Sequence, residues 1–378
     1  MEAFSTPTIS ESTVERRTGE GSSVTRATDT AFQDRVLLGV SRTFALTIPQ
    51  LPTELRRAVG NAYLLCRIAD TIEDDAGLTA EQKTHHLGTF NDILDTGDGA
   101  EAFARELHLR LDPSTPAAER GLIRECTRVL RITGGLDPRQ QAAISRCVTI
   151  MSRGMDRFER DRSPHGLETL ADHERYCYVV AGVVGEMLTE LFCAHSVRID
   201  ARRQALMSRA VRFGQGLQMT NILKDIWEDL ERDTCWLPRD VFLRHGFDLG
   251  RMQSRRADPA FDRGMNEMVG IAHSCLRDAL AYTLLIPRRE AGVRRFLLWA
   301  IGLAVLTLRK IDRYPGFTSG DQVKVSRRTV RAVVSSTSAL SASNLALTAI
   351  FSLAAGGLPV EAPAPRQQKR RNHMEMMQ

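Results

Sequence analysis

Apolar residues recur at helical spacing over most of the chain, and this periodicity constrains the fold more than any other feature of the sequence. The amphipathic segments are separated by short breaks rich in proline, glycine or aspartate, and the alternation typical of β-strands is scarce. No internal linker is long enough to mark a second domain. We therefore predict an all-α, single-domain helical bundle over residues 32–358. The predicted breaks lie near residues 48–52, 112–116, 134–138, 162–166, 313–316 and 319–321.

The two ends of the chain differ in composition from this core. Residues 1–31 are rich in Ser, Thr, Glu and Arg and carry no apolar run, which predicts a disordered leader and not a secretory signal. Residues 359–378 predict a basic disordered tail. The apolar stretch 339–360 is interrupted by serines, an asparagine and a Gly-Gly pair, so a final core helix is favoured over a membrane-spanning one.

Charge and cysteine content narrow the class of protein. The net charge is +5 over 378 residues, and the basic residues are interleaved with acidic ones, which argues against nucleic-acid binding. The seven cysteines are scattered, without the spacing of a metal site, which predicts reduced thiols in a cytoplasmic protein. The basic excess is compatible with a modest attraction to phosphate groups or to a membrane surface. Nothing in the sequence predicts the oligomeric state.

Two segments of the predicted bundle repeat the carboxylate spacing Asp-x-x-Glu-Asp. They are YLLCRIADTIEDD, which begins at Tyr63, and GLQMTNILKDIWEDL, which begins at Gly216. On a helix, each set of acids falls on one face, opposite an apolar stripe. The first acidic motif consists of Asp70, Glu73 and Asp74, and the second consists of Asp225, Glu228 and Asp229.

Paired acidic motifs of this kind predict a magnesium site. One motif alone is more often a solvated helix face, but closely packed like charges repel unless a cation lies among them. Mg²⁺ takes a few carboxylate oxygens and keeps its other positions for water and phosphate. Two facing motifs can therefore hold substrate diphosphates through bridging metals and stabilise a departing diphosphate.

Four ordered motifs resemble the squalene and phytoene synthase family over nearly all of the predicted domain. They are the two acidic segments, the second extended to Pro238, together with SRTFAL from Ser41 and YCYVVAGVVGEMLTELF from Tyr176. The resemblance is closest to the squalene synthases of that family. It implies an all-α isoprenoid synthase fold with a central active-site cavity.

The resemblance also implies roles for individual residues. The six acids would bind Mg²⁺, with Asp70, Asp74, Asp225 and Asp229 also counted as catalytic. Arg67 would act on the leaving diphosphate, although a salt bridge to a neighbouring acid is the alternative. Tyr176 would steer proton loss, with a buried structural phenol as its alternative. The implied substrate-binding residues are Ser41, Arg42, Phe44, Tyr63, Val180, Gln218 and Asn221.

The implied reaction joins two farnesyl diphosphates through presqualene diphosphate, which NADPH then reduces to squalene. The stretch VKVSRRTV resembles a basic segment of squalene synthases, so Lys324, Arg327 and Arg328 would attract NADPH phosphates, although a solvated basic helix start explains them equally. A synthase that stops at presqualene diphosphate or dehydrosqualene, or that makes phytoene, is the alternative within the family. A non-catalytic assembly protein of this fold is the distant alternative, but all six acids are present.

Two departures from the family pattern weaken the reductive half of this expectation more than the coupling half. The segment ERDTCWLP lacks a glycine-bearing flap near Arg232, and FLLWAIGLAVLTL lacks the proline-glutamine pair of eukaryotic squalene synthases.

Overall fold

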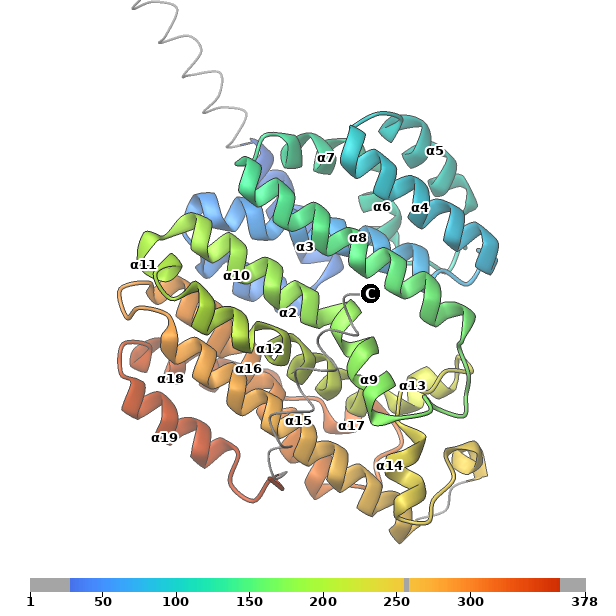
Figure 1. The fold of residues 1–378 in the computed structure, drawn as a ribbon, viewed down its shortest axis with the longest axis vertical. Coiled ribbons are helices and arrows are strands. Elements are labelled where there is room, and N and C mark those ends of the chain that lie inside the picture. The colour runs from blue at the N-terminus through green and yellow to red at the C-terminus, as the bar shows by residue number, and fades with distance from the viewer. Residues whose placement is uncertain (1–27, 255–257, 361–378) are drawn as a thin grey trace, which may run out of the picture.

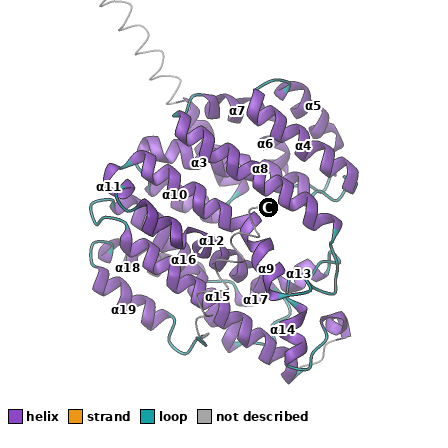
Figure 2. Cartoon of the chain, in the orientation of Figure 1, coloured by secondary structure: helices purple, strands orange, loops and turns teal. Residues whose placement is uncertain are grey.

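The computed structural model describes residues 28–254 and 258–360 of the chain. Figure 2 shows that the described part consists of helices joined by loops and turns. Within it, the only bridge between extended segments is the isolated pair of Leu167 and Pro238. The predicted all-α fold is confirmed.

The helices follow one another with short connections. Residues 28–40 form a first helical segment. The next elements are α2 (Arg42–Thr47), the 3-10 turn η1 (Ile48–Gln50), α3 (Thr53–Asp74), α4 (Ala80–Thr96), α5 (Ala100–Arg110), α6 (Ala117–Arg124), α7 (Cys126–Gly134) and α8 (Pro138–Arg160). The middle of the chain forms α9 (Leu170–Cys177), the π-helical turn η2 (Tyr178–Gly182), α10 (Val183–His195), α11 (Val197–Asp200), α12 (Arg203–Lys224), α13 (Ile226–Leu230) and α14 (Arg239–Arg244). The last elements are η3 (Leu249–Ser254), α15 (Pro259–Leu285), α16 (Ala291–Arg313), α17 (Gly320–Val323), α18 (Arg327–Leu340) and α19 (Asn344–Ala354).

Local sequence signals explain where several helices begin. The hydroxyl of Thr79 caps α4 and the hydroxyl of Thr169 caps α9, each in a capping box. Asp137 caps α8, and Pro138 occupies the first helical position, where its missing N–H costs no hydrogen bond. The starts of α8 and α9, and the loops at 111–116 and 161–169, fall at or next to breaks that the sequence predicts, whereas the start of α4 does not.

Helix α12 lies at the centre of the bundle (Figure 1). It packs along α15 and also against α10, η2 and α16. Helix α10 contacts α3 and α8 in addition to α12, and α8 packs on α4. Helix α3, which carries the first acidic motif, and α12, which leads into the second, are therefore held together through α10.

Two glycines let the chain around η2 approach α12 at backbone distance. A Cβ atom on Gly185 would lie 2.1 Å from the carbonyl oxygen of Ala210, and one on Gly214 would lie 2.0 Å from that of Ala181. Neither position tolerates a side chain without separating the helices. Gly185 thus makes room for a close neighbour, the backbone of α12.

The ends of the described part differ in detail from the sequence-based boundaries. Residues 28–31, assigned from sequence to the leader, are helical, because Asp29 is buried and pairs with Arg131 (2.6 Å) and Arg128 (3.6 Å). The predicted leader up to residue 27 and the predicted tail from residue 361 lie outside the described residues.

The apolar stretch 339–360 does not form one long helix. It is divided between the end of α18 and α19, with a break at residues 341–343. Two other segments, Leu170–His195 and Ala291–Arg313, are long and apolar enough to cross a membrane by length and composition, and more than half of each apolar window is buried inside the bundle. Burial of this extent is typical of core helices in a folded domain.

Candidate active site

The first acidic motif occupies the last turn and a half of α3, as its periodicity predicts. Asp70 and Glu73 are partly buried, and Asp74 is the last residue of the helix. The opposite face is fully buried and consists of Leu64, Leu65, Ile68 and Ile72. Because a helix carries partial negative charge at its C-terminal end, the helix itself adds to the repulsion among these acids. This arrangement favours a bound cation.

Arg67 lies one turn before Asp70, the first acid of the first acidic motif. Its guanidinium lies 3.5 Å from Asp70 and also pairs with Glu119 of α6. The salt bridge considered from sequence is therefore present, and it holds the guanidinium beside Asp70. Burial raises the pKa of Asp70 to about 7, with Arg67 opposing and Asp74 adding to the rise. Burial also raises the pKa of Glu73 well above its usual value, and the neighbouring acids Asp74 and Asp70 add to this.

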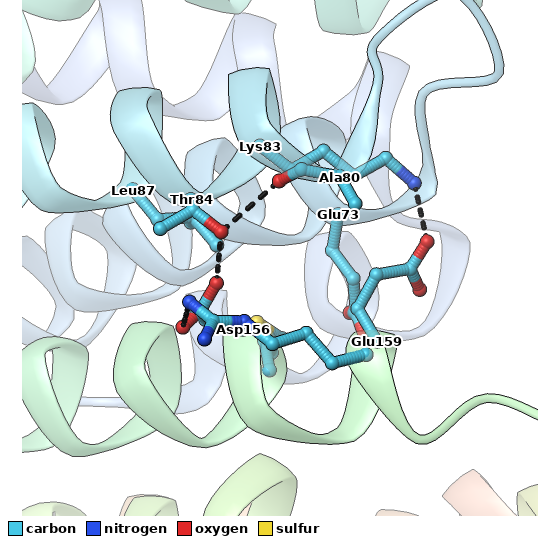
Figure 3. A pocket seen from close by; sticks show the side chains of 9 residues that line it. Glu73, Ala80, Lys83, Thr84, Leu87, Asp156 and Glu159 are labelled. Carbon is cyan, nitrogen blue, oxygen red and sulfur yellow. Dashed lines mark hydrogen bonds and ion pairs between the residues drawn. The ribbon is translucent and has the colours of Figure 1, made fainter.

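A second ion pair, between Lys83 of α4 and Glu159 of α8, borders the same motif (Figure 3). The Lys83 Nζ lies 2.9 Å from a Glu159 carboxylate oxygen. Both residues line a small crevice together with Glu73, Thr84 and Asp156. The first acidic motif is thus surrounded by fixed charges of both signs.

The second acidic motif lies at a bend, which the helical periodicity did not predict. Helix α12 ends at Lys224, Asp225 has φ −98° and ψ 14°, and α13 begins at Ile226. Hydrogen bonds of helical pattern continue across the bend, because Asp225 N–H donates to Asn221 O (2.8 Å) and Asp229 N–H to Asp225 O (2.9 Å). The predicted apolar stripe is confirmed by the burial of Met219, Ile222, Leu223, Ile226 and Leu230.

Contacts from distant parts of the chain fix the second motif. Lys224 pairs with Asp225. The Gly320 N–H at the start of α17 donates to Glu228 Oε1 (2.7 Å), and a Cβ atom on Gly320 would meet Asp225 Oδ1 at 3.0 Å. Gln218 is partly buried and Asn221 exposed on the preceding turns of α12. Gly320 carries no side chain, so sequence alone gave no signal for its role.

The two acidic motifs lie close enough to influence each other electrostatically. Burial raises the pKa of Asp229 to about 6; Asp225 adds to the rise, Arg232 opposes it, and Asp74 of the first motif adds to it. The pKa of Asp74 is raised by burial and lowered by Arg67 and by Arg232. Arg232 therefore acts on both motifs. Sequence analysis did not include it in the site, although it lies only three residues beyond Asp229.

Tyr176, at the end of α9, lies beside both acidic motifs. Its ring stacks on Trp236 (centroids 3.9 Å apart, planes at 9°) and packs edge-on against Phe158. Burial raises the pKa of Tyr176 well above its usual value, and Glu73 of the first motif and Asp229 of the second add to the rise. The phenol is thus buried, as the structural alternative requires, and it also lies near acids of both motifs.

His173 holds the stack of Tyr176 and Trp236 in place through a contact with the Trp236 backbone. Its Nδ1 lies 2.7 Å from the carbonyl oxygen of Trp236, and its Nε2 lies 3.7 Å from the Cys177 Sγ. Because a carbonyl only accepts hydrogen bonds, Nδ1 carries the proton. Burial lowers the pKa of His173 to about 4, so the ring is neutral at neutral pH.

The segment after Tyr176 departs from regular α-helix. The π-helical turn η2 contains Val180, which is partly buried. A π turn inserts an extra residue, so the side chains that follow it are displaced from regular α-helical spacing. Such turns are frequent at functional sites.

The SRTFAL segment forms the start of α2, next to the first motif's helix. Ser41 Oγ accepts the Phe44 N–H (3.0 Å) and so caps α2. The Phe44 ring packs against Tyr63 (centroids 4.7 Å apart), and Tyr63 donates a hydrogen bond to Val40 O (3.3 Å). Burial raises the pKa of Tyr63. The side chain of Arg42, the first residue of α2, lies outside the described part of the structure.

The basic stretch expected to bind a nucleotide follows α17, which packs on α13. Lys324 is exposed and pairs with Asp321 (3.0 Å), and Arg327 and Arg328 are exposed in the first turn of α18. Lys310 of α16, which sequence analysis did not include, donates to Lys324 O (2.6 Å). Four cations thus flank the loop that contacts the second acidic motif.

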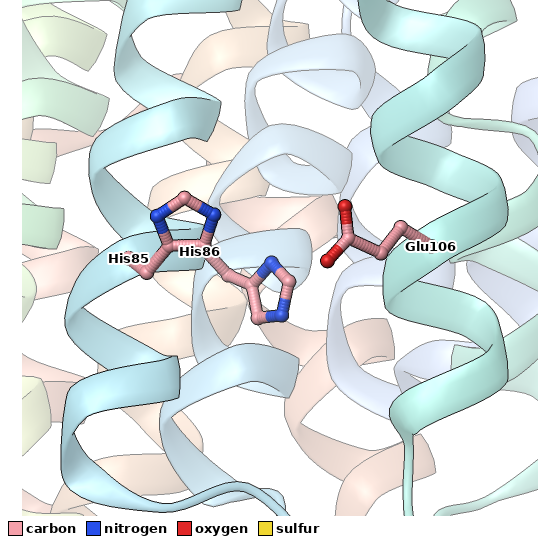
Figure 4. A group of neighbouring side chains, drawn as sticks. All are labelled: His85, His86 and Glu106. Carbon is pink, nitrogen blue, oxygen red and sulfur yellow. The ribbon is translucent and has the colours of Figure 1, made fainter.

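A different group of potential metal ligands lies on α4 and α5 (Figure 4). Ligand atoms of His85, His86 and Glu106 all lie within 4.8 Å of one another. The acids of the two motifs are not gathered so tightly in the described residues. Wider spacing suits ligands that share a metal with substrate phosphates, because Mg²⁺ uses few protein carboxylates in such sites.

A family model described as squalene/phytoene synthase matches residues 37–329. The chain belongs to the squalene/phytoene synthase family. It is 29% identical to the squalene synthase ERG9 of Candida albicans over 286 residues, which cover 74% of this chain and 61% of that protein. It is also 29% identical to squalene synthase 1 of Arabidopsis thaliana over 273 residues, covering 71% and 62% respectively.

A solved structure shares the fold over almost its whole length. The complex of TcSQS with the ligand BPH1237 superposes with a TM-score of 0.71 at 26% identity, covering 92% of this chain and 98% of that one. The aligned region spans less than two thirds of the length of the two curated relatives. The family and its fold are therefore established.

Proposed function

We propose that this protein is a Mg²⁺-dependent squalene synthase that couples two farnesyl diphosphates and reduces the product with NADPH. The observation that carries the proposal is the placement of two Asp-x-x-Glu-Asp motifs around one buried tyrosine, Tyr176. The donor set fits the metal, since it is made of carboxylate oxygens whose mutual repulsion a hard cation relieves. When bound, Mg²⁺ would supply positive charge at the departing diphosphate.

In the first half-reaction, the C–O bond of one farnesyl diphosphate breaks and diphosphate leaves. The double bond of the second substrate attacks the allylic cation, and loss of a proton closes the cyclopropane of presqualene diphosphate. Arg67, fixed by Glu119, would hold the leaving oxygens, and Tyr176 with its acidic neighbours would orient the proton that is lost. The apolar side chains around Tyr176, including Phe158 and Trp236, would exclude water from the cation.

In the second half-reaction, the C–O bond of presqualene diphosphate breaks, and hydride transfer from NADPH to the rearranged cation gives squalene, diphosphate and NADP⁺. Lys310, Lys324, Arg327 and Arg328 would bind the phosphates of NADPH beside α17. The named relatives support this half, since both are squalene synthases. The hydrophobic product and the partly apolar surface of α19 support work by a cytoplasmic protein at a membrane surface.

The test is incubation of the purified protein with radiolabelled farnesyl diphosphate and Mg²⁺, with and without NADPH. We expect squalene only when NADPH is present, and no turnover in EDTA. Dehydrosqualene or presqualene diphosphate as the sole product with NADPH would overturn the reductive half. Failure to consume farnesyl diphosphate would overturn the substrate assignment, and geranylgeranyl diphosphate would then be tested for phytoene formation before an assembly role is considered.

A further inference from the structure

A cavity lined by four arginines lies away from both acidic motifs. Its volume is about 370 Å³, and it is enclosed by the connection between α15 and α16, the start of α12 and the start of α19. Helix α12 runs for 22 residues from this cavity to the second acidic motif, which corresponds to about 33 Å at 1.5 Å per residue. In Figure 1, α11 and α13 accordingly lie on opposite sides of the bundle. The lining residues are Arg202, Leu284, Ile286, Pro287, Arg288, Arg289, Arg294 and Asn344.

The positive charge of this cavity is not balanced by its lining. None of the lining residues is acidic. Within residues 28–254 and 258–360, none of the four arginines forms an ion pair with a carboxylate. The nearest acid along the chain, Glu290, accepts a hydrogen bond from Ser196 (2.6 Å) instead. Arg202, Arg288 and Arg289 are exposed at the rim.

Arg294 lies fully buried at the inner side of the cavity. Its exposed fraction is 0%, and its guanidinium is held by Ile286 O (2.8 Å) and Asn344 Oδ1 (2.7 Å), while Nε has no partner in the described part of the chain. Burial lowers the pKa of Arg294, and the positive charge of Arg288 adds to this effect. A buried charge without a counter-ion is costly, so the cluster is better explained by an anion than by folding alone.

Phosphate is the anion that this arrangement fits best. Arginine presents planar pairs of N–H donors that match phosphate oxygens, and four arginines line this cavity. The start of the eleven-residue helix α19 adds the partial positive charge of a helix N-terminus on the same side. A volume of about 370 Å³ exceeds that of an inorganic ion and falls in the range of small-ligand pockets.

We propose that the four-arginine cavity binds a phosphate-bearing anion at a site separate from the two acidic motifs. The phosphate group comes either from a free soluble molecule or from a phospholipid headgroup. Leu345, next to Asn344, is 84% exposed at the start of α19 and would meet the acyl region if the source were a lipid.

The experiment uses the full chain in EDTA, so that no divalent cation supports phosphate binding at the acidic motifs. One arm titrates inorganic phosphate and inorganic diphosphate by calorimetry. The other measures co-sedimentation with phosphatidylglycerol vesicles and with phosphatidylcholine vesicles. The test variant is Arg288→Ala/Arg289→Ala, which removes two exposed arginines. The control variant Arg105→Ala/Arg110→Ala removes the same charge from the exposed face of α5.

We expect the test variant to bind at least about tenfold more weakly in one arm, with the control variant unchanged. Loss in the calorimetric arm identifies a soluble phosphate, and loss only with phosphatidylglycerol vesicles identifies a lipid headgroup. Absence of binding in both arms, or equal binding by the wild type and the test variant, would overturn the site. None of these readouts depends on turnover of farnesyl diphosphate, so they are independent of the proposed function.

Discussion

The two acidic motifs share one sequence pattern but are held in different ways. The first lies on an unbroken helix and is flanked by ion pairs from α3, α4, α6 and α8. The second lies at a bend, and its position depends on a backbone contact from Gly320, far along the chain. The first motif is therefore preorganised by the N-terminal half of the chain. The position of the second motif depends on the C-terminal segment, which also carries the proposed nucleotide-binding residues.

The largest expected effect is on turnover, and it distinguishes Asp70, a proposed metal ligand, from Asp75, a neighbouring acid with a structural role. We expect Asp70→Asn to lower turnover by about 10²–10³-fold while leaving the fold intact, because in the proposed reaction it removes a charge that would act at the leaving diphosphate. Turnover of farnesyl diphosphate and the circular dichroism spectrum measure this.

The matched control is Asp75→Asn. Asp75 is buried and accepts hydrogen bonds from the backbone of Gly77 (2.9 Å) and Asp112 (3.0 Å) and from the Thr115 hydroxyl (2.6 Å). Its replacement should cost about 1–3 kcal/mol of stability. If both variants lost the same activity and kept their stability, the assignment of a ligand role to Asp70 and a structural role to Asp75 would be wrong.

The next effect concerns His173, which contacts the backbone of Trp236 in the aromatic stack beside the motifs. Its pKa is about 4 in the folded protein against 6.5 in the unfolded chain, so its stabilising contribution is complete above pH 6.5 and is lost as the pH falls toward 4. The contribution is about 3 kcal/mol. We expect the free energy of unfolding of His173→Gln, measured with denaturant, to depend less on pH between 4 and 6.5 than that of the wild type.

Replacement of the exposed His165 by glutamine serves as the control, and it should leave the pH dependence unchanged. If His173→Gln retained the wild-type slope between pH 4 and 6.5, the neutral buried imidazole would not be the cause.

Gly320→Ala tests the dependence of the second motif on α17. The added methyl group would meet Asp225 Oδ1 and Lys224 O at 3.0 Å and should displace the start of α17 from the motif. We expect a fall of about tenfold in kcat, equivalent to about 1.4 kcal/mol in the activation barrier. Gly316→Ala is the control, because a Cβ atom there has no neighbour within 4 Å. Equal kinetics in the two variants would make the second motif independent of α17.

The smallest effect is the response of each motif to pH. The pKa of Asp70 is raised to about 7 and that of Asp229 to about 6. Protonation of these groups therefore stabilises the metal-free fold at low pH. This stabilisation is lost as the pH rises through the two pKa values. Protons and Mg²⁺ therefore compete. We expect the increase in Tm caused by Mg²⁺ to be a few degrees larger at pH 8 than at pH 5.5.

Asp70→Asn should reduce that pH response, since it removes one carboxyl group of raised pKa while Glu73, Asp74 and Asp229 remain. An Mg²⁺ response that is the same at both pH values would contradict competition at these carboxylates.

Much of the fold could be predicted from the sequence, because it depends on local signals. The spacing of apolar residues predicted the helices and the buried face opposite Asp70, and proline and glycine residues predicted the breaks between helices. The bend at Asp225 could not be predicted, since hydrogen bonds of helical pattern continue through it. The roles of Arg232, Trp236 and Gly320 depend on contacts between segments distant in the sequence, which periodicity does not encode. The assigned functions of the site residues remain predictions.

The backbone contact between η2–α10 and α12 has a consequence for how this protein moves. Gly185 and Gly214 bring the two segments into backbone contact, where a Cβ atom on either glycine would lie 2.1 Å or 2.0 Å from a carbonyl oxygen of the other segment. Tyr176 and the body of α12 should therefore move as one rigid unit. Any closure around a bound substrate must come from segments beyond this seam, such as α13 after the bend at Asp225 or the loop that ends at Gly320. We therefore expect α12 to stay fixed up to Asp225 and α13, which follows it, to move.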